Sequence, residues 1–197
     1  EAEKTVAEIV ADGGRAAAFA ADLRDEAAVR GLFDATERAL GPVRLLINNA
    51  SVFENDTAMT EDRAIWDANI DVNLRAPFVL SQCLARSLPS GVDGNIINIV
   101  DQRVLNLTPY FTSYTVSKEG LWTLTQTLAQ AFAPNLRVNA IGPGPVLPSP
   151  RQTEAQFERQ YRALPLARAV DVAEICRAVR FILESPSMTG QIIVLDA

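Results

Sequence analysis

The chain has 197 residues, 48% of them hydrophobic and 21% charged, which suits one globular domain and excludes a disordered or fibrous protein. The absence of histidine excludes Ser-His-Asp and Cys-His catalysis, and two cysteines are too few for an all-thiolate zinc site, so we expect no metal. The net charge of −6 argues against a nucleic-acid partner, and no apolar run approaches the ~20 residues that span a bilayer, so we expect no membrane segment. Cys83 and Cys176 lie in apolar helical patterns and fit two thiols in a reducing cytosol, so we expect a cytoplasmic location.

Helix and strand signals alternate along the chain. In order, the sequence predicts a helix over 1–11, a strand over 15–21, a helix over 26–40, a strand over 43–47, a long helical region over 60–88, a strand over 95–100, a helix over 112–133, a strand over 136–141, an amphipathic segment over 153–163, a helix over 172–184 and a strand over 191–195. Pro77 predicts a kink or break near Arg75–Pro77. Strands separated by helices indicate an α/β fold, with a parallel sheet that carries helices on both faces.

Polar residues follow several of the predicted strands. They are Asp22, Asn48–Ser51, Asp101 and Gly142–Pro145. In open α/β sheets, ligands bind outside the carboxyl ends of the strands. We therefore expect the functional site among these residues.

Tyr114 and Lys118 are four residues apart on one predicted helix, and so on one face of it. The unperturbed pKa of tyrosine is ~10, and a cation one turn away lowers it by stabilising the phenolate. The pair can therefore serve as a proton donor that needs no histidine. The spacing alone would arise by chance in about a third of chains of this size, and the alternative is a surface tyrosine beside a solvated lysine.

A set of motifs along the whole chain resembles the short-chain dehydrogenase/reductase family. The matching elements are Asp22-Leu23 after a strand, N-N-A-S at 48–51, V-N-L-R-A at 72–76, I-I-N-I at 96–99, S-Y-T-V-S-K at 113–118, R-V-N-A-I-G-P-G at 137–144 and T-G-Q at 189–191. The resemblance implies a Rossmann-like, doubly wound parallel sheet in three layers, with residues 1–197 as one dinucleotide-binding oxidoreductase domain. It also implies a homo-oligomer, a dimer or tetramer, that associates through the helices over 60–88 and 112–133.

The resemblance also assigns roles to matching residues. Tyr114 would donate a proton to the reduced substrate, and Lys118 would lower the tyrosine pKa and bind the nicotinamide ribose. Asn73 would hold a water of the proton relay through its helix backbone. The implied cofactor contacts are Asp22 and Leu23 on the adenine, Asn49 and Ala50 on the adenosine side, and Pro143 and Gly144 beside the nicotinamide, together with Ser51, Tyr114 and Lys118.

One position departs from the family pattern. The family usually has a serine thirteen residues before the tyrosine, where this chain has Asp101. One interpretation is a decayed, inactive site. The other is a substrate that is not a simple ketone, because a carboxylate beside Tyr114 keeps the phenol protonated and suits reduction of a C=N bond in a basic ring.

The combination of Asp101, Tyr114 and Lys118 resembles the pteridine reductase branch, whose members reduce pterins and folates with NADPH. The segment Asn49–Phe53 is similar to the N-A-S-x-F of that branch, in which the phenylalanine stacks on the pterin ring. The resemblance implies NADPH rather than NAD as cofactor, and Phe53, Asp101 and Tyr114 as substrate-binding residues, with Val146–Leu164 as a substrate lid. Phe53 could instead be a hydrophobic plug, and the chain could be a reductase of another carbonyl or imine, or a non-catalytic nucleotide-binding relative.

The T-G-x-x-x-G-x-G turn of the family does not occur in the sequence. That turn lets the backbone approach a pyrophosphate at a helix N-terminus. The chain therefore resembles a family member without its first ~50 residues, the length of one strand-helix-strand unit, and it stops before the glycines with which the family continues. We expect these 197 residues alone to bind a dinucleotide weakly and to expose apolar surface at the sheet edge.

Overall fold

The computed structural model describes residues 1–149 and 151–197 and shows one parallel sheet of four strands. The strands lie side by side in the order β1-β2-β3-β4 and are β1 (Leu45–Asn48), β2 (Gly94–Ile99), β3 (Leu136–Pro143) and β4 (Ile192–Leu195). The helices are α1 (Ala2–Ala11), α2 (Glu26–Leu40), α3 (Arg63–Ile70), α4 (Ala76–Ser87), α5 (Thr112–Ala131), α6 (Glu154–Arg162) and α7 (Val172–Glu184).

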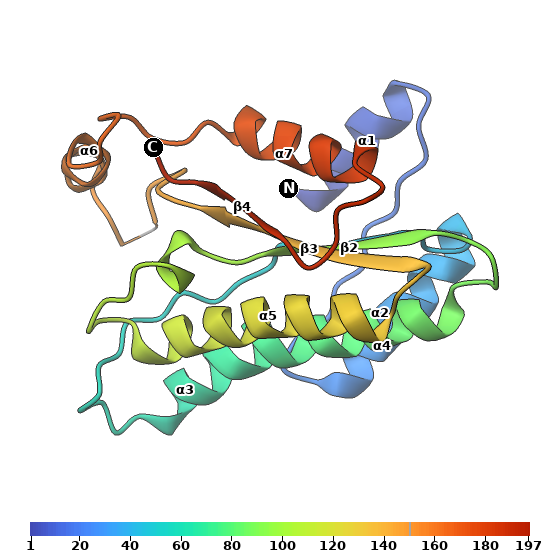
Figure 1. Ribbon diagram of the computed structural model, residues 1–197, viewed down its shortest axis with the longest axis horizontal. Helices are drawn as coiled ribbons and strands as arrows, with labels where there is room; N and C mark the ends of the chain where they lie inside the picture. Colours follow the sequence, from blue (N-terminus) through green and yellow to red (C-terminus); the bar gives the residue numbers. More distant parts are fainter. Residues whose placement is uncertain (150) are drawn as a thin grey trace.

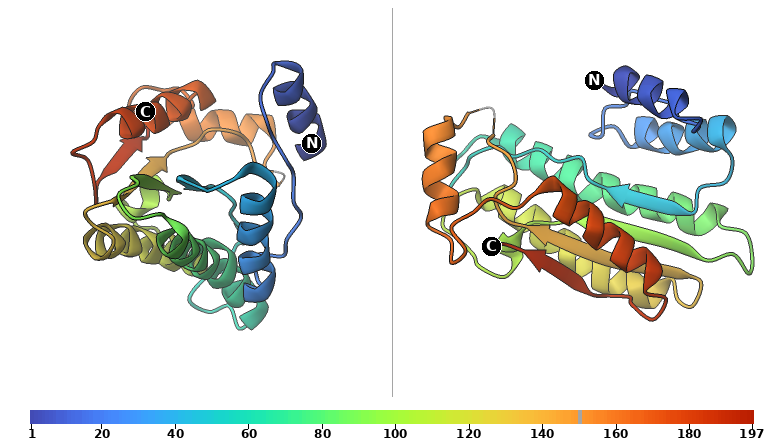
Figure 2. Two further views of the ribbon diagram at one scale, coloured as in Figure 1. Left: turned by 90° about the vertical axis from the view of Figure 1, so that its right-hand side faces the viewer. Right: turned by 90° about the horizontal axis from the view of Figure 1, so that it is seen from above.

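Helices cover both faces of the sheet. Figure 1 shows α7 on one side of the sheet and α5, α4, α2 and α3 on the other, and Figure 2 shows the same layers from the end of the sheet. Helix α1 buries no residue and stands apart from these layers. This arrangement confirms the predicted three-layer, Rossmann-like α/β fold. None of the helices in the described residues is both long enough and apolar enough to cross a membrane.

Most helix ends follow from local capping. Helix α2 spans the predicted 26–40, because the Asp25 carboxylate accepts from the N–H groups of Ala27 and Ala28, and Gly41 ends the helix with φ +95°. Helix α7 spans the predicted 172–184 and begins with a capping box between Asp171 and Glu174.

The long helical region is broken where proline predicts. Between α3 and α4 lies a π-helical turn, η1 (Asp71–Arg75), and Pro77 is the second residue of α4. Proline has no N–H to donate to the carbonyl of Asn73, so regular α-helix cannot continue through this point. The turn buries Val72 and Asn73, which places a functional candidate inside the fold.

The predicted strand over 15–21 is wrong. These residues form no strand, and in Figure 2 the segment runs from α1 toward α2 apart from the sheet. An apolar run becomes a strand only when a neighbouring strand pairs with its backbone, and β1 pairs only with β2 among the described strands. The sequence analysis also missed a short 3₁₀ turn, η2 (Gln102–Val104).

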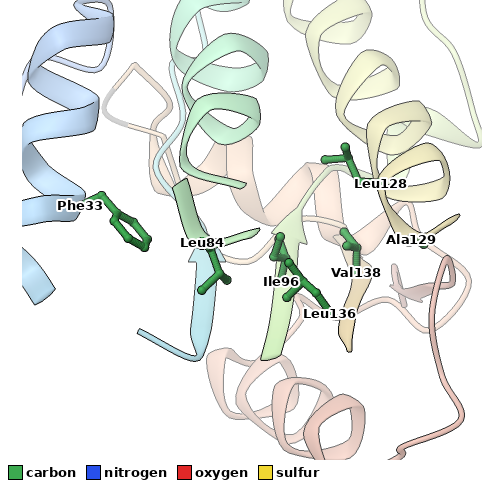
Figure 3. Packing of buried hydrophobic residues seen from close by; sticks show 7 residues of the cluster. All are labelled: Phe33, Leu84, Ile96, Leu128, Ala129, Leu136 and Val138. Atoms are coloured by element: carbon green, nitrogen blue, oxygen red, sulfur yellow. The ribbon is translucent and has the colours of Figure 1, made fainter. Parts of the chain in front are cut away.

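Alternating side chains of the central strands build a core on each face of the sheet. Ile96 and Val138 pack toward α4 and α5 together with Leu84 and Leu128, as Figure 3 shows. The next residue of β2, Ile97, points to the other face and packs with Ile182 of α7. Burial on both faces explains why these strands are apolar at nearly every position.

Strand β1 is an edge of the sheet. Its Leu45 and Ile47 are 38% and 41% exposed, and a cavity of about 290 Å³ beside it is lined mainly by apolar side chains. This agrees with the expectation of exposed apolar surface at the sheet edge.

A buried chain of hydrogen bonds connects the sheet to α5, and a substitution that breaks it should lower the stability of the protein. Asn48 donates to Asn98 Oδ1 at 2.7 Å, and Asn98 donates to Thr125 Oγ1 at 2.9 Å. We expect Asn98→Leu to lower the free energy of unfolding by about 2–4 kcal/mol, because it leaves two buried polar groups without partners. Urea unfolding measures this, and Asn106→Leu on the exposed surface is the control; equal midpoints for the two variants would contradict it.

Candidate active site

The site lies at the carboxyl ends of the strands. A cavity of about 350 Å³ opens there, and its lining includes Phe53, Asp101, Arg103, Tyr114, Gly144 and Phe157. Asp101 lies two residues after the end of β2, Gly144 follows β3 directly, and Tyr114 comes from the first turn of α5. The topology therefore brings together residues that the sequence analysis selected from separate parts of the chain.

Asp101 holds the hydroxyl of Tyr114. The phenol donates to Asp101 Oδ2 at 2.7 Å, while Asp101 Oδ1 accepts from the backbone N–H of Arg103 at 2.8 Å. The second bond caps the turn η2 and fixes the carboxylate. Tyr114 is only 6% exposed, so this pairing takes place away from bulk water.

Burial and the adjacent Asp101 carboxylate both raise the pKa of Tyr114 above its usual value. The pair Tyr114–Lys118 alone predicts a lowered pKa, whereas the structure shows the opposite direction, which is the one expected from Asp101. The tyrosine is therefore held as a protonated phenol at neutral pH.

Lys118 is 3% exposed and donates to the backbone carbonyl of Ile99 at 2.8 Å. Its ammonium nitrogen lies 5.7 Å from the centroid of the Tyr114 ring. Burial lowers the pKa of Lys118 to about 8. The side chain can therefore gain or lose a proton close to neutral pH.

We expect Lys118→Met to raise the free energy of unfolding at pH 7 by about 2 kcal/mol. Removing a charge whose pKa is lowered this far gains about 3 kcal/mol, and the lost bond to Ile99 offsets about 1 kcal/mol. The pKa of Lys118 is lower in the folded state, so between pH 8 and 10.5 the unfolded chain holds a proton that the folded chain has lost. The stability of the wild-type protein therefore rises with pH in this range. The stability advantage of Lys118→Met over the wild type shrinks by the same amount. Urea unfolding at several pH values tests this, with exposed Lys4→Met as the control; a less stable Lys118→Met protein at pH 7 would refute it.

Asn73 joins the loop after β1 to α5. Its amide oxygen accepts from Ser51 Oγ at 3.0 Å and from the N–H of Val52 at 2.8 Å. Its amide nitrogen donates to the carbonyl of Val52 at 2.9 Å and to Ser117 Oγ at 3.0 Å. The side chain of Asn73 is thus fully used in positioning the loop that leads to Phe53.

Phe53 lies beside the reactive pair. Its ring meets Tyr114 edge-to-face at a centroid distance of 4.7 Å and stacks on Phe111 at 4.3 Å with an interplanar angle of 8°. Phe53 is 38% exposed and lines the cavity, so it is more than a buried plug. Phe111, which the sequence analysis missed, has φ +57°, a left-handed conformation that is uncommon for a bulky residue.

Asp56 is a further residue of the site, and its own sequence neighbourhood does not mark it as one. This buried carboxylate accepts from the N–H of Ser113 with both oxygens, each at 3.1 Å, and its backbone carbonyl accepts from the N–H of Phe111 at 2.8 Å. Asp56 therefore caps the helix that carries Tyr114 and Lys118. No local pattern could reveal it, because its partner lies 57 residues away in the chain.

The candidate adenosine contacts lie near the end of β1. Leu23 lines one cavity with Asn49 and Ala50, although it also packs against the helix core. The Asp22 carboxylate is bound by the Arg24 guanidinium, Nη2 to Oδ2 at 2.7 Å, which lowers the pKa of Asp22 to about 2. Ser51 follows Asn49 and Ala50 in the chain and is exposed, and its hydroxyl donates to Asn73 Oδ1.

The candidate nicotinamide contacts come from the end of β3. Pro143 closes this strand, and Gly144 lines the catalytic cavity and donates to the carbonyl of Leu195 at 2.7 Å. A Cβ on Gly144 would lie 2.1 Å from Asp196 Oδ1 and 3.0 Å from Asp196 Cα, so a larger residue here would force Asp196 to move. The Tyr114 hydroxyl lines the same cavity as Gly144, whereas the Lys118 ammonium is buried and is bonded to the carbonyl of Ile99.

The family model described as Enoyl-(Acyl carrier protein) reductase matches residues 1–197. A curated relative, Carbonyl reductase [NADPH] 2 of Sus scrofa, is 34% identical over 85% of this chain and 73% of its own length. A short-chain type dehydrogenase/reductase of Picea abies is 32% identical over 87% of this chain, which spans 65% of that relative.

A solved structure agrees more closely. The crystal structure of FolM Alternative dihydrofolate reductase 1 from Brucella canis, complexed with NADP, superposes with a TM-score of 0.95 at 48% identity and covers 99% of this chain and 77% of that one. The matched family model, these relatives and the fold agree with the motifs read from the sequence. The chain belongs to the short-chain dehydrogenase/reductase family, whose members are oxidoreductases.

Proposed function

We propose that the protein is an NADPH-dependent reductase of a pterin or folate ring. The observation that carries the proposal is the hydrogen bond from the Tyr114 hydroxyl to Asp101 at 2.7 Å, with the Phe53 ring edge-to-face on the same tyrosine. A protonated phenol, a carboxylate and an aromatic face together suit a flat, nitrogen-rich ring. The 48% identical Brucella canis protein, whose structure names dihydrofolate reductase and NADP, supports the same substrate class.

NADPH, when bound, supplies the hydride that reduces the C=N carbon. Tyr114 supplies the proton to the ring nitrogen, because its raised pKa keeps the hydroxyl protonated until the nitrogen becomes basic. Asp101 orients this hydroxyl and can accept from ring N–H and amino groups of the substrate. Asn73 and Ser51 keep the Phe53 loop in place.

Lys118 returns a proton to the tyrosine after each turnover. A phenolate beside Asp101 is unfavourable, so the proton must be replaced quickly. The pKa of Lys118, lowered to about 8, allows the ammonium to give up a proton near neutral pH. The same ammonium suits the hydroxyls of a bound ribose.

The remaining contacts complete the proposal. Asp22, Leu23, Asn49 and Ala50 would bind the adenosine side of the cofactor, with Pro143 and Gly144 beside the nicotinamide. A homo-oligomer, dimer or tetramer, is supported by Trp66 on α3 and Val116 on α5, which are 43% and 42% exposed. A cytoplasmic location stays a prediction.

The test is an absorbance assay of NADPH oxidation by the full-length protein, with dihydrobiopterin, dihydrofolate, a ketone and a sugar as separate substrates. We expect oxidation with a dihydropteridine. The second candidate, a reductase of another carbonyl, is favoured by the 34% identical carbonyl reductase of Sus scrofa. Turnover of the ketone or the sugar with neither pteridine would reject the proposal in favour of that candidate.

A further inference from the structure

Arg103 has a buried nitrogen without a partner. Its Nη1 atom is shielded from solvent and has no hydrogen-bond partner among residues 1–149 and 151–197. The guanidinium carbon lies 4.8 Å from the centroid of the Phe111 ring and 5.4 Å from that of Phe53. A buried donor left without an acceptor is costly, so such a group in a native protein calls for an explanation, such as strain, a catalytic role or a bound water or ion.

Arg103 also stands where two cavities meet. It lines the catalytic cavity of about 350 Å³ and a second cavity of about 880 Å³. Phe53 lines both as well, so a ring held against Phe53 has a direct path past Arg103 into the second cavity. Because a pteridine ring is small, it would occupy only the catalytic cavity. The second cavity would then remain free for the rest of a larger substrate.

The lining of the second cavity suits a ligand that carries both amide groups and a negative charge. Its lining carries the side-chain amides of Asn55, Gln152, Gln156 and Gln160. Its other arginine, Arg151, is already paired with Glu54. Arg103 has no carboxylate partner within the described part of the chain, so its charge is available to a ligand.

We propose that Arg103 binds a carboxylate on the tail of the substrate, and that the substrate is a pteridine with an anionic, amide-containing tail, as in dihydrofolate, rather than an unconjugated pterin. This inference rests on the proposed function. A guanidinium is well suited to the role because its N–H groups match both oxygens of a carboxylate. Arg103 is then a specificity-determining residue that does not take part in the chemistry.

The test compares two substrates that share a ring and differ in the tail. In the Arg103→Met protein, the KM for dihydrofolate is expected to rise about 10–100-fold, the loss typical of one charge-assisted hydrogen bond. The KM for dihydrobiopterin and the kcat for both substrates should change by less than about threefold, since methionine preserves most of the packing on Phe53 and Phe111. Arg180→Met, on the exposed face of α7, is the matched control.

Equal effects on both substrates would show that Arg103 only packs on the aromatic rings and would overturn the inference. Calorimetry on the NADP⁺-loaded protein separates this from a failure of the proposed function. If the protein reduces neither substrate but binds folic acid more tightly than biopterin, and Arg103→Met removes that difference, the proposed function fails and the anion site stands. Equal affinities of the wild-type protein for folic acid and biopterin would reject the anion site.

Discussion

The Tyr114→Phe variant is expected to reduce dihydropteridines with a kcat lowered by about 10²–10⁴-fold, the usual contribution of a positioned general acid. The substitution removes one hydroxyl and keeps the ring against Phe53, so the KM should change little. Steady-state NADPH oxidation with dihydrofolate measures both constants.

Tyr110→Phe is the matched control for this variant. Tyr110 is 61% exposed, and the catalytic cavity is lined by Tyr114 instead. We expect its kcat to stay within about twofold of wild type. A Tyr114→Phe protein that retains more than a tenth of the wild-type kcat would show that the proton comes from another group.

The Asp101→Asn variant should lower kcat by about 10–100-fold and move the alkaline limb of the pH–rate profile to lower pH. Asparagine keeps the shape and an acceptor for the Tyr114 hydroxyl but removes the charge that raises the pKa of Tyr114. The same charge raises the pKa of Lys118, so that pKa falls below about 8 in the variant. With both pKa values lowered, Tyr114 and Lys118 lose their protons at a lower pH than in the wild-type protein.

Rates measured from pH 6 to 10 test this, with exposed Asp93→Asn as the control. An alkaline limb that does not move would mean that Asp101 does not set the protonation of this site. An unchanged kcat at pH 7 would mean that Asp101 is a capping residue of the turn at 102–104 and nothing more.

The fold could be predicted from the sequence wherever the signals were local. Asp25 and Gly41 bound α2, and Pro77 marked the π-helical break, because capping and proline act within one turn. The prediction of a strand over 15–21 was wrong, because an apolar segment forms a strand only beside a neighbouring strand, and its own residues do not show whether one is there.

The site divides in the same way. Motif positions such as Asp101 and Tyr114 were found because parallel strands bring their carboxyl ends together. Asp56 and Phe111 were missed because their importance comes from contacts with residues distant in the chain. The raised pKa of Tyr114 was uncertain from the sequence because burial, its largest cause, follows only from the fold.

The proposed reduction of a pteridine ring, with Tyr114 as the proton donor, can be followed by isotope labelling. The most direct measurement follows deuterium from NADPH labelled on the transferred C4 position into the product, by mass spectrometry. We predict a tetrahydropteridine with one deuterium on carbon, formed by the wild-type protein, and formed by Tyr114→Phe at a rate about 10²–10⁴-fold lower. Deuterium that enters a ketone or sugar, with no labelled tetrahydropteridine from either dihydrofolate or dihydrobiopterin, would show that the protein is not a pteridine reductase.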